Sequence, residues 1–219
     1  MGRLNSGGSS TSLRRSLFPE GFAGLVMSHL LETWQTFSLH RRVQLENEIT
    51  ALFCDALKEA YVVAGRNWII VPEYPITDPI RGIQLGRIDL CFFPSEHHGQ
   101  KVFFTLECKR LRVHTKSGLK HLADKYVEKG LQRFVDGKYS ADHPCGGMLG
   151  YVMDNCLDEA FNSIQCEIHK RRSVLKMKKK NSICVPSRTA PSHLWSLDTF
   201  HRRSDGELTV HHLLVGVAR

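Results

Sequence analysis

Three apolar runs in the first half of the chain set the strongest limit on its fold. They cover residues 68–75, 84–93 and 101–111, are enriched in Val, Ile, Phe or Leu, and are separated by loops that contain Pro or Gly. Runs of this length and composition are typical of β-strands. Because short loops favour pairing between neighbours in the chain, the sequence predicts a three-stranded antiparallel meander.

Helical patterns flank this meander. From Leu39 to Ala64, apolar residues recur at steps of three and four, which predicts an amphipathic helix that ends near Gly65. A second helix is expected over residues 119–135. Residues 146–153 form another apolar run after the turn-like segment HPCGG. The predicted order is therefore αβββαβ.

The remaining segments extend this core. Residues 155–169 carry apolar side chains on one side of a helix, and two strand-like runs, 193–200 and 207–217, flank the turn RRSDGE. Residues 1–16 are rich in Gly and Ser and are expected to be disordered, because they have too few apolar groups to offset the entropy lost on ordering. We therefore predict a single α/β domain over residues 17–219, with a C-terminal helix and β-hairpin.

Composition limits the partners and the compartment. Lys and Arg number 30 against 22 Asp and Glu, a formal charge of +8, which favours a polyanionic partner. The seven cysteines are odd in number and scattered, so they are interpreted as small buried hydrophobic residues in a reducing cytoplasm. No apolar run approaches the roughly 18 residues of a membrane span. The absence of Walker, GxGxxG, HExxH and GxSxG motifs weakens the case for an NTPase, dehydrogenase, zincin or serine hydrolase.

Charged side chains emerge where two of the predicted strands end. Successive side chains of a strand alternate between faces, so Glu107 and Lys109 of the segment TLECKR point the same way. Asp89 lies among apolar neighbours in GRIDLCFF, on the preceding strand, but the register between the strands cannot be read from the sequence. If Asp89 faces Glu107, the two carboxylates repel each other unless a cation lies between them. Such oxygen ligands suit Mg²⁺ and phosphodiester hydrolysis, with Lys109 offsetting negative charge.

This set of residues resembles the core of the PD-(D/E)XK nuclease superfamily: Asp89, then Glu107, Cys108 and Lys109 on the next strand, inside an αβββαβ order. The resemblance covers about residues 39–153, and an isoleucine stands at the proline position that names the motif. It implies a restriction-endonuclease-like α/β fold, with a mixed central sheet flanked by helices. It also implies a Mg²⁺-dependent nuclease, with Mn²⁺ as a substitute cofactor.

The superfamily also commonly carries a glutamate on its first helix, and the segment ENEIT resembles that element. Glu46 falls on the apolar stripe of the predicted helix, where a carboxylate needs a polar partner, whereas Glu48 falls off it. We therefore expect Glu46 to be a further catalytic and metal-binding residue, with Glu48 as the alternative. By the same resemblance, Asp89 and Glu107 ligate the metal and the backbone carbonyl of Cys108 completes its coordination.

Several basic segments are candidates for contact with nucleic acid. The segment HKRRSVLKMKKK is either a solvated surface or a grip on phosphates, and both interpretations stay open. The helix after TLECKR carries further basic residues, among them Lys129 and Arg133, and in this superfamily it often lies near the substrate. A C-terminal pattern resembles the tail of some bacterial restriction and phage-defence nucleases, with an ordinary hairpin turn as the alternative. The predicted nucleic-acid-binding residues are Lys176, Lys178, Lys179, Lys180, His201 and Arg202.

The sequence thus predicts a metal-dependent endonuclease that acts on DNA in preference to RNA, with a role in restriction or phage defence. The alternative is a catalytically silent protein of the same fold that binds nucleic acid or a protein. For Glu107 and Lys109 alone, the structural alternative is an exposed ion pair at a sheet edge. Strandedness of the substrate, a protein partner and a homodimer stay open, and no association with a membrane is expected.

Overall fold

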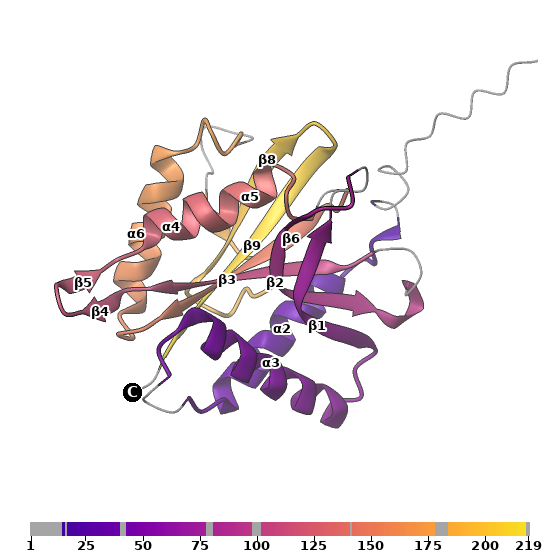
Figure 1. Ribbon diagram of the computed structural model, residues 1–219, viewed down its shortest axis with the longest axis horizontal. Coiled ribbons are helices and arrows are strands. Elements are labelled where there is room, and N and C mark those ends of the chain that lie inside the picture. Colours follow the sequence, from indigo (N-terminus) through magenta and orange to yellow (C-terminus); the bar gives the residue numbers. More distant parts are fainter. Residues whose placement is uncertain are drawn as a thin grey trace, which may run out of the picture.

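A seven-stranded mixed sheet forms the centre of the computed structural model (Figure 1). The structure describes residues 15, 17–39, 43–77, 81–97, 102–140, 142–177 and 184–217. The strands are β1 (Trp68–Thr77), β2 (Gln84–Pro94), β3 (Phe104–Leu111), β6 (Cys145–Val152), β7 (Val185–Pro186), β8 (Ser196–Arg203) and β9 (Gly206–Gly216). They lie in the order β1-β2-β3-β6-β9-β8-β7. The β3–β6 and β6–β9 pairs are parallel, and the other pairs in this sheet are antiparallel.

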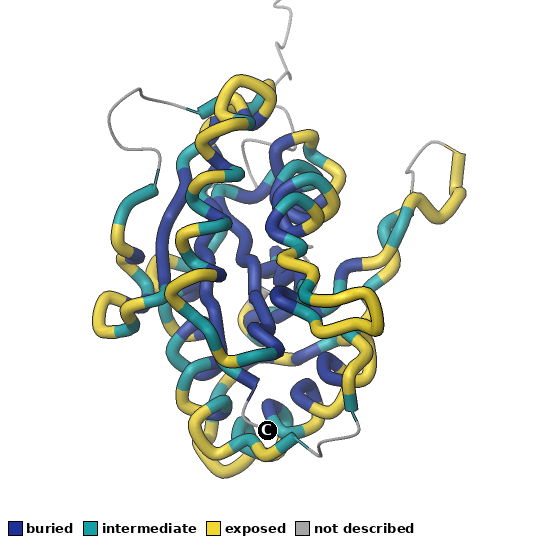
Figure 2. The backbone as a smooth tube through the Cα atoms, turned by 90° about the vertical axis from the view of Figure 1, so that its left-hand side faces the viewer, coloured by how far each residue is buried: buried dark blue, intermediate teal, exposed yellow. Residues whose placement is uncertain are grey.

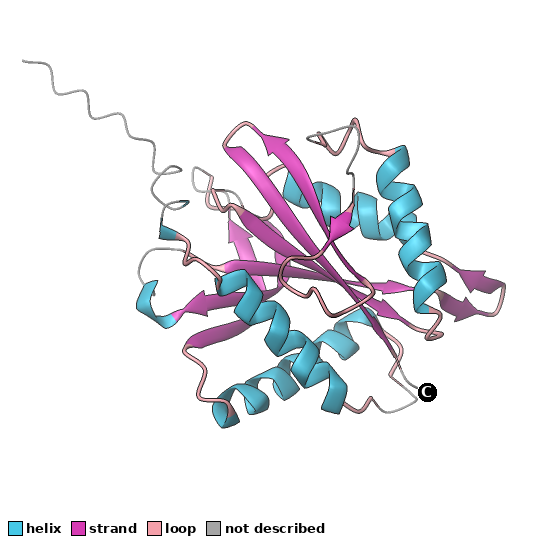
Figure 3. Ribbon diagram, turned by 180° about the vertical axis from the view of Figure 1, so that it is seen from behind, coloured by secondary structure: helices cyan, strands magenta, loops and turns pink. Residues whose placement is uncertain are grey.

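Helices cover both faces of the sheet (Figure 3). The helices are α2 (Phe22–Thr36), α3 (Glu46–Val63), α4 (Ala123–Lys125), α5 (Gln132–Val135) and α6 (Leu157–Lys170), with a π-helical turn, η2 (Tyr126–Leu131), joining α4 to α5. Helices α2 and α3 share a core with Leu106 and Leu149, whereas α4, α5 and α6 share the other core with Met148. Since neighbouring residues of a strand point to opposite faces, the central strands are buried on both sides.

The helical segment 123–135 packs closely on the sheet at Gly130. A β-carbon at this position would lie 2.4 Å from Cε of Met148 and 3.7 Å from Cγ of Lys109. A larger residue would therefore force Met148 or the helix to move. Gly130 belongs to the π-helical turn, and such turns are frequent at functional sites.

The main predictions about the order of elements are confirmed. Strands β1, β2 and β3 form the antiparallel meander, and strands β8 and β9 form the closing hairpin. The order αβββαβ is present from α3 to β6, with the short strands β4 and β5 inserted before the second helix, and α6 follows it as predicted. The sheet mixes parallel and antiparallel pairs, as expected.

Two helix boundaries differ from the predictions. The first predicted helix begins at Glu46 instead of Leu39, and the second begins at Ala123 instead of Leu119. Leu119 lies in β5 (Gly118–Lys120), which pairs with β4 (Val113–Thr115) because Gly118 adopts the positive φ of 108° that the tight turn requires. Helix α2 was not predicted, although its buried residues recur at helical spacing. The disorder expected for residues 1–16 concerns residues that, apart from Arg15, lie outside the described part of the chain.

Strand β2 leaves the regular sheet at Asp89. It pairs with β3 only from Leu90 to Phe92, and the β1–β2 ladder is interrupted opposite Asp89, at Glu73, whose φ is 46°. Beyond this point the two strands continue as an exposed two-stranded arm that projects from the body (Figure 2). Non-glycine residues with positive φ are uncommon and cluster at functional sites, so this irregularity marks the base of the arm as a place to look for one.

Candidate active site

The meander brings the acidic residues of β2 and β3 together. Leu90 pairs with Leu106, so continuing the register by one residue sets Asp89 opposite Glu107. Cys108, between Glu107 and Lys109, packs into the core shared with α2 and α3. The register that the sequence left open is therefore the one in which the two carboxylates are neighbours.

The ammonium group of Lys109 lies among the oxygens that were predicted to bind a metal. Its Nζ lies 2.9 Å from Oε1 of Glu107 and 3.0 Å from Oε1 of Glu46. It donates to the Cys108 carbonyl at 2.7 Å, and Oδ2 of Asp89 is 4.0 Å away. Four oxygen atoms that can accept hydrogen bonds, from three elements, thus surround one cationic nitrogen.

Glu46, and not Glu48, belongs to this cluster. Glu46 is the first residue of α3, and its second oxygen, Oε2, accepts the backbone N–H of Arg110 at 2.8 Å. Glu48 is exposed to solvent. Both carboxylates lie in the first turn, where negative charge stabilises a helix, so this effect does not distinguish them, whereas their contacts do.

The carboxylate of Glu107 is buried without a full set of hydrogen-bond partners among the described residues. Its side chain is 2% exposed, and its Oε2 has no hydrogen-bond partner among the described residues. Burial and the neighbouring charge of Asp89 raise the pKa of Glu107 to about 7, although Lys109 and Arg133 oppose this rise. Because buried carboxylate oxygens are normally paired, this atom has an unused capacity to bind a cation.

The other two charged groups on these strands are also perturbed. Burial raises the pKa of Asp89 above its usual value, while the charge of Lys109 and a 2.6 Å hydrogen bond from the Cys108 N–H act in the opposite direction. Burial alone would lower the pKa of Lys109, but the carboxylates of Glu107, Asp89 and Glu46 raise it overall, so Lys109 remains charged. The pKa values of Asp89, Glu107 and Lys109 are therefore all raised, and perturbed pKa values gathered in one cluster are typical of functional sites.

The donor set fits a hard divalent cation. Mg²⁺ prefers oxygen ligands and usually takes one or two carboxylates while keeping several waters. Asp89, Glu107 and the Cys108 carbonyl offer such oxygens, and Oε2 of Glu107 is unpartnered within the described residues. Within those same residues, no group of three or more His, Cys, Asp or Glu side chains is arranged to hold an ion by itself. An ion at this position would therefore need water or substrate to complete its coordination.

Arg133 of α5 also reaches the cluster. Its NH1 lies 3.5 Å from Oε1 of Glu107 and bonds the hydroxyl of Tyr139, which donates to the carbonyl of Arg87 at 3.1 Å. In the sequence, Arg133 is only one of several basic residues on a helix. No local pattern distinguishes it, because its contact with Glu107 depends on how the helix packs across the sheet.

The predicted basic tract is only partly described. Lys178, Lys179 and Lys180 lie outside the described residues. Lys176 and Arg202 are exposed, and the Lys176 carbonyl accepts the backbone N–H of Arg202 at 2.9 Å. The two basic side chains therefore start from adjacent backbone. Three acidic residues, Asp136, Asp142 and Asp205, line a hollow of about 300 Å³ together with Lys176.

The prediction that His201 contacts phosphate is wrong for this structure. His201 is completely buried, because the alternation along β8 turns it inward while Arg202 points to solvent. Its Nδ1 contacts the Leu175 carbonyl at 2.7 Å and its Nε2 contacts Oγ1 of Thr199 at 2.8 Å. Burial lowers the pKa of His201 to about 4, so its ring is neutral at pH 7.

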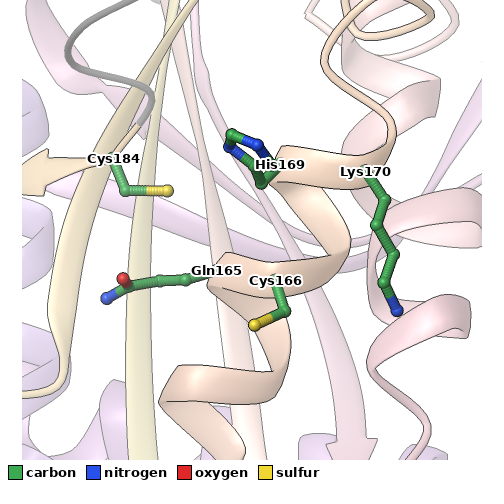
Figure 4. Close-up of a pocket in the computed structure, with 5 residues that line it drawn as sticks. All are labelled: Gln165, Cys166, His169, Lys170 and Cys184. Atoms are coloured by element: carbon green, nitrogen blue, oxygen red, sulfur yellow. The ribbon is translucent and has the colours of Figure 1, made fainter.

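A hollow of about 440 Å³ beside α6 contains none of the predicted catalytic residues (Figure 4). It is lined by Gln165, Cys166, His169, Lys170 and Cys184. Burial raises the pKa of Cys184 to about 11, so its thiol is protonated and weakly nucleophilic at neutral pH. Among the seven cysteines, Cys54, Cys91, Cys108 and Cys145 are buried as predicted, Cys156 and Cys184 are partly buried, and Cys166 is exposed.

Comparison of the chain with protein-family models, with curated proteins and with solved structures gives no match. None of the helices in the described ranges combines the length and the apolar character needed to cross a bilayer. The cluster formed by Glu46, Asp89, Glu107 and Lys109 is therefore the feature of the molecule that indicates a function, through its geometry and its electrostatics.

Proposed function

We propose that this chain is a metal-dependent nuclease of the PD-(D/E)XK superfamily that hydrolyses phosphodiester bonds in DNA. The observation that carries the proposal is the gathering of Glu46, Asp89, Glu107 and the Cys108 carbonyl around the ammonium of Lys109. The unpartnered oxygen of Glu107 supports it further. The αβββαβ order and the mixed sheet are consistent with a restriction-endonuclease-like core.

Each residue has a role that its position supports. Asp89, Glu107 and the Cys108 carbonyl would hold Mg²⁺, or Mn²⁺ in its place, with Glu46 contributing directly or through water. When bound, such an ion supplies positive charge and lowers the pKa of a bound water. Lys109 keeps its charge and is oriented by Glu46, so it stabilises negative charge that develops on the phosphate.

A second candidate function has its own observation. Lys109 already pairs with Glu46 and Glu107, so the cluster is also a self-sufficient ion-pair network. A catalytically silent protein that binds nucleic acid or a protein would need no more than this. The two candidates differ in metal binding: a working site is stabilised by Mg²⁺, by about 2.7 kcal/mol at a concentration 100 times the Kd.

The deciding experiment incubates the protein with labelled single- and double-stranded DNA and RNA in Mg²⁺, in Mn²⁺ and in EDTA, and measures thermal unfolding in the same buffers. We expect DNA cleavage that requires the metal, together with a rise in Tm on adding Mg²⁺. Cleavage of RNA alone would correct the substrate but keep the reaction. If no substrate is cleaved and Mg²⁺ leaves the Tm unchanged, the silent function replaces the nuclease.

A further inference from the structure

Arg133 presents a guanidinium group at the edge of the site. Its NH1 lies 3.5 Å from Oε1 of Glu107, and its side chain is 40% exposed, whereas that of Glu107 is 2% exposed. Lys109 already pairs with the same oxygen at 2.9 Å. Arg133 is therefore not the main counter-ion of Glu107, and much of its charge faces outward.

The position of Arg133 is fixed by the residues that follow α5. The hydroxyl of Tyr139 accepts a hydrogen bond from NH1, and its ring centroid lies 5.5 Å from Cζ of Arg133. Tyr139 is 3% exposed, and its hydroxyl donates to the carbonyl of Arg87 on β2. The chain folds back here because Gly137 adopts a φ of 74°, and the Arg133 carbonyl then accepts the Tyr139 N–H at 3.2 Å.

Among the described residues, the contacts of Arg133 leave one edge of its guanidinium unused. The approach to Glu107 and the bond to Tyr139 both involve NH1, so the edge formed by Nε and NH2 takes no part in them. This edge carries donors in the parallel geometry that matches two oxygens of a phosphate. Neutralising Glu107 requires neither the hydrogen bond to Tyr139 nor a free Nε–NH2 edge. These two features therefore indicate a further ligand for Arg133.

We propose that Arg133 binds the two non-bridging oxygens of a phosphate of the nucleic acid at this site, and that Tyr139 is the positioning residue that orients it. The inference depends on the proposed nuclease function and deepens it, because it assigns substrate contact to a residue outside the metal-binding set. Arg133 lies beside Glu107, so the phosphate it holds is adjacent to the carboxylates that perform the chemistry.

The test measures the affinity of a short fluorescent DNA duplex in Ca²⁺, the affinity for Mg²⁺ by calorimetry, and the Tm. The variants are Arg133→Gln, Arg133→Lys, Tyr139→Phe and the control Lys129→Gln. Lys129 lies on the same helical segment, is 55% exposed and pairs with Glu128 at 2.8 Å. Its replacement removes the same charge without touching Glu107.

We expect Arg133→Gln to weaken duplex binding by roughly 10- to 100-fold, the loss typical of a charge-assisted hydrogen bond, and Lys129→Gln by a few-fold at most. Arg133→Lys should recover only part of the affinity, since an ammonium cannot form the paired bonds. Tyr139→Phe should weaken duplex binding less than Arg133→Gln does. The double variant should bind the duplex as weakly as Arg133→Gln alone, because Tyr139 acts through Arg133. Mg²⁺ affinity of Arg133→Gln should stay the same or rise, because a cation beside Glu107 is lost.

The proposal is overturned if Arg133→Gln binds the duplex as well as Lys129→Gln does. It is also overturned if Arg133→Gln loses duplex affinity, Mg²⁺ affinity and Tm together, because that pattern indicates a structural role. Failure here is separable from failure of the nuclease function. A parent protein that cleaves DNA, with an Arg133→Gln variant that binds like the parent, sinks only the assignment of Arg133, whereas a parent that cleaves nothing sinks the nuclease.

Discussion

Two clusters of buried polar side chains differ in how completely they are satisfied. In the candidate site, Glu107 has one oxygen without a partner among the described residues. In the C-terminal hairpin, Asp198 is also completely buried, but its Oδ1 contacts Nδ1 of His211 and accepts Oγ–H of Ser187, both at 2.8 Å, and its Oδ2 accepts the Arg188 N–H at 3.0 Å. The carboxylate of Glu107 therefore has one oxygen without a partner among the described residues, whereas both oxygens of Asp198 have partners.

A separate chain of hydrogen bonds in the same hairpin is also fully paired. Oγ1 of Thr199 lies between His201 and His212, at 2.8 and 2.9 Å from their Nε2 atoms, and Nδ1 of His212 lies 3.1 Å from the Tyr126 hydroxyl. Burial lowers the pKa of His201 to about 4 and that of His212 to about 3, so both rings are neutral. Within the described residues, this network has no buried side-chain atom without a partner.

The difference separates structure from function. Burial alone would raise the pKa of Asp198, but His211, the Arg188 N–H and Ser187 outweigh burial and lower it. For Glu107, burial and the charge of Asp89 outweigh Lys109 and Arg133 and raise the pKa. Fully paired polar networks make a core specific and stable, whereas an underpaired charge costs stability and persists where a ligand uses it.

The largest expected effect separates the clusters by activity. Asp89→Ala and Glu107→Ala should each abolish cleavage without loss of fold, because each removes a proposed metal ligand. Lys109→Ala should lower turnover by roughly 10²-fold or more, because it removes charge that stabilises the transition state. Turnover of labelled DNA, with circular dichroism as the control for folding, checks all three. Full activity in either carboxylate variant would show that the site lies elsewhere.

The satisfied cluster should show the opposite behaviour. Asp198→Asn keeps the size of the side chain but turns one acceptor into a donor and leaves His211 without its charged partner. We expect a loss of about 3 kcal/mol in the free energy of unfolding, measured with urea at pH 8. Cleavage per folded molecule should match that of the parent. An unchanged unfolding free energy would show that the complete pairing of Asp198 does not stabilise the fold.

The matched isosteric change in the site is Glu107→Gln. The pKa of Glu107 rises from 4.5 to about 7 on folding, so its contribution to stability is fully present below pH 4.5 and is lost as the pH rises through about 7. The variant lacks this loss and should gain up to about 3 kcal/mol relative to the parent between pH 4.5 and pH 8. Urea unfolding across this range measures the gain.

The acid limb of the same pH profile sharpens the comparison. His201 and His212 have pKa values below the usual 6.5, so they contribute stability that is lost as the pH falls from 6.5 toward 4 and 3. This limb should be unaltered by Glu107→Gln. Parallel profiles of parent and variant between pH 4.5 and pH 8 would show that ionisation of Glu107 has no cost in the free energy of unfolding.

A smaller effect distinguishes the two glutamates of α3. Glu46→Gln should preserve the helix but weaken Mg²⁺ binding by roughly 10- to 100-fold, since outer ligands and their orienting partners have effects of this size. Activity should then fall at low Mg²⁺ and recover in part at high Mg²⁺. Glu48→Gln should behave like the parent. The reverse result would mean that the contacts of Glu46 with Lys109 and Arg110 are only structural.

The smallest effect concerns the basic tract. Replacing its lysines with glutamine should weaken DNA binding at moderate salt without changing the chemistry. With fewer phosphate contacts, binding releases fewer counter-ions. Each lost contact should flatten the slope of log affinity against log salt by about 0.9. An unchanged slope would identify the tract as a solvated surface. The residues to replace are Lys176, Lys178, Lys179 and Lys180.

Local periodicity was sufficient for much of the site. Glu107 and Lys109 share a face because side chains alternate along any strand, and the apolar neighbours of Asp89 predicted a buried strand without knowledge of its partner. The choice of Glu46 over Glu48 followed from the helical repeat. These properties depend on bond geometry and on the order of residues, so they can be read before the chain is folded.

The tertiary structure decided what depends on pairing and packing. The register of β2 on β3 set Asp89 opposite Glu107, and the packing of α5 across the sheet brought Arg133 to the same carboxylate. The burial of His201 followed from which face of β8 meets the core, and this reversed its predicted role. Contacts between residues far apart in the chain arise from the collapse of whole elements onto one another, and no local pattern encodes them.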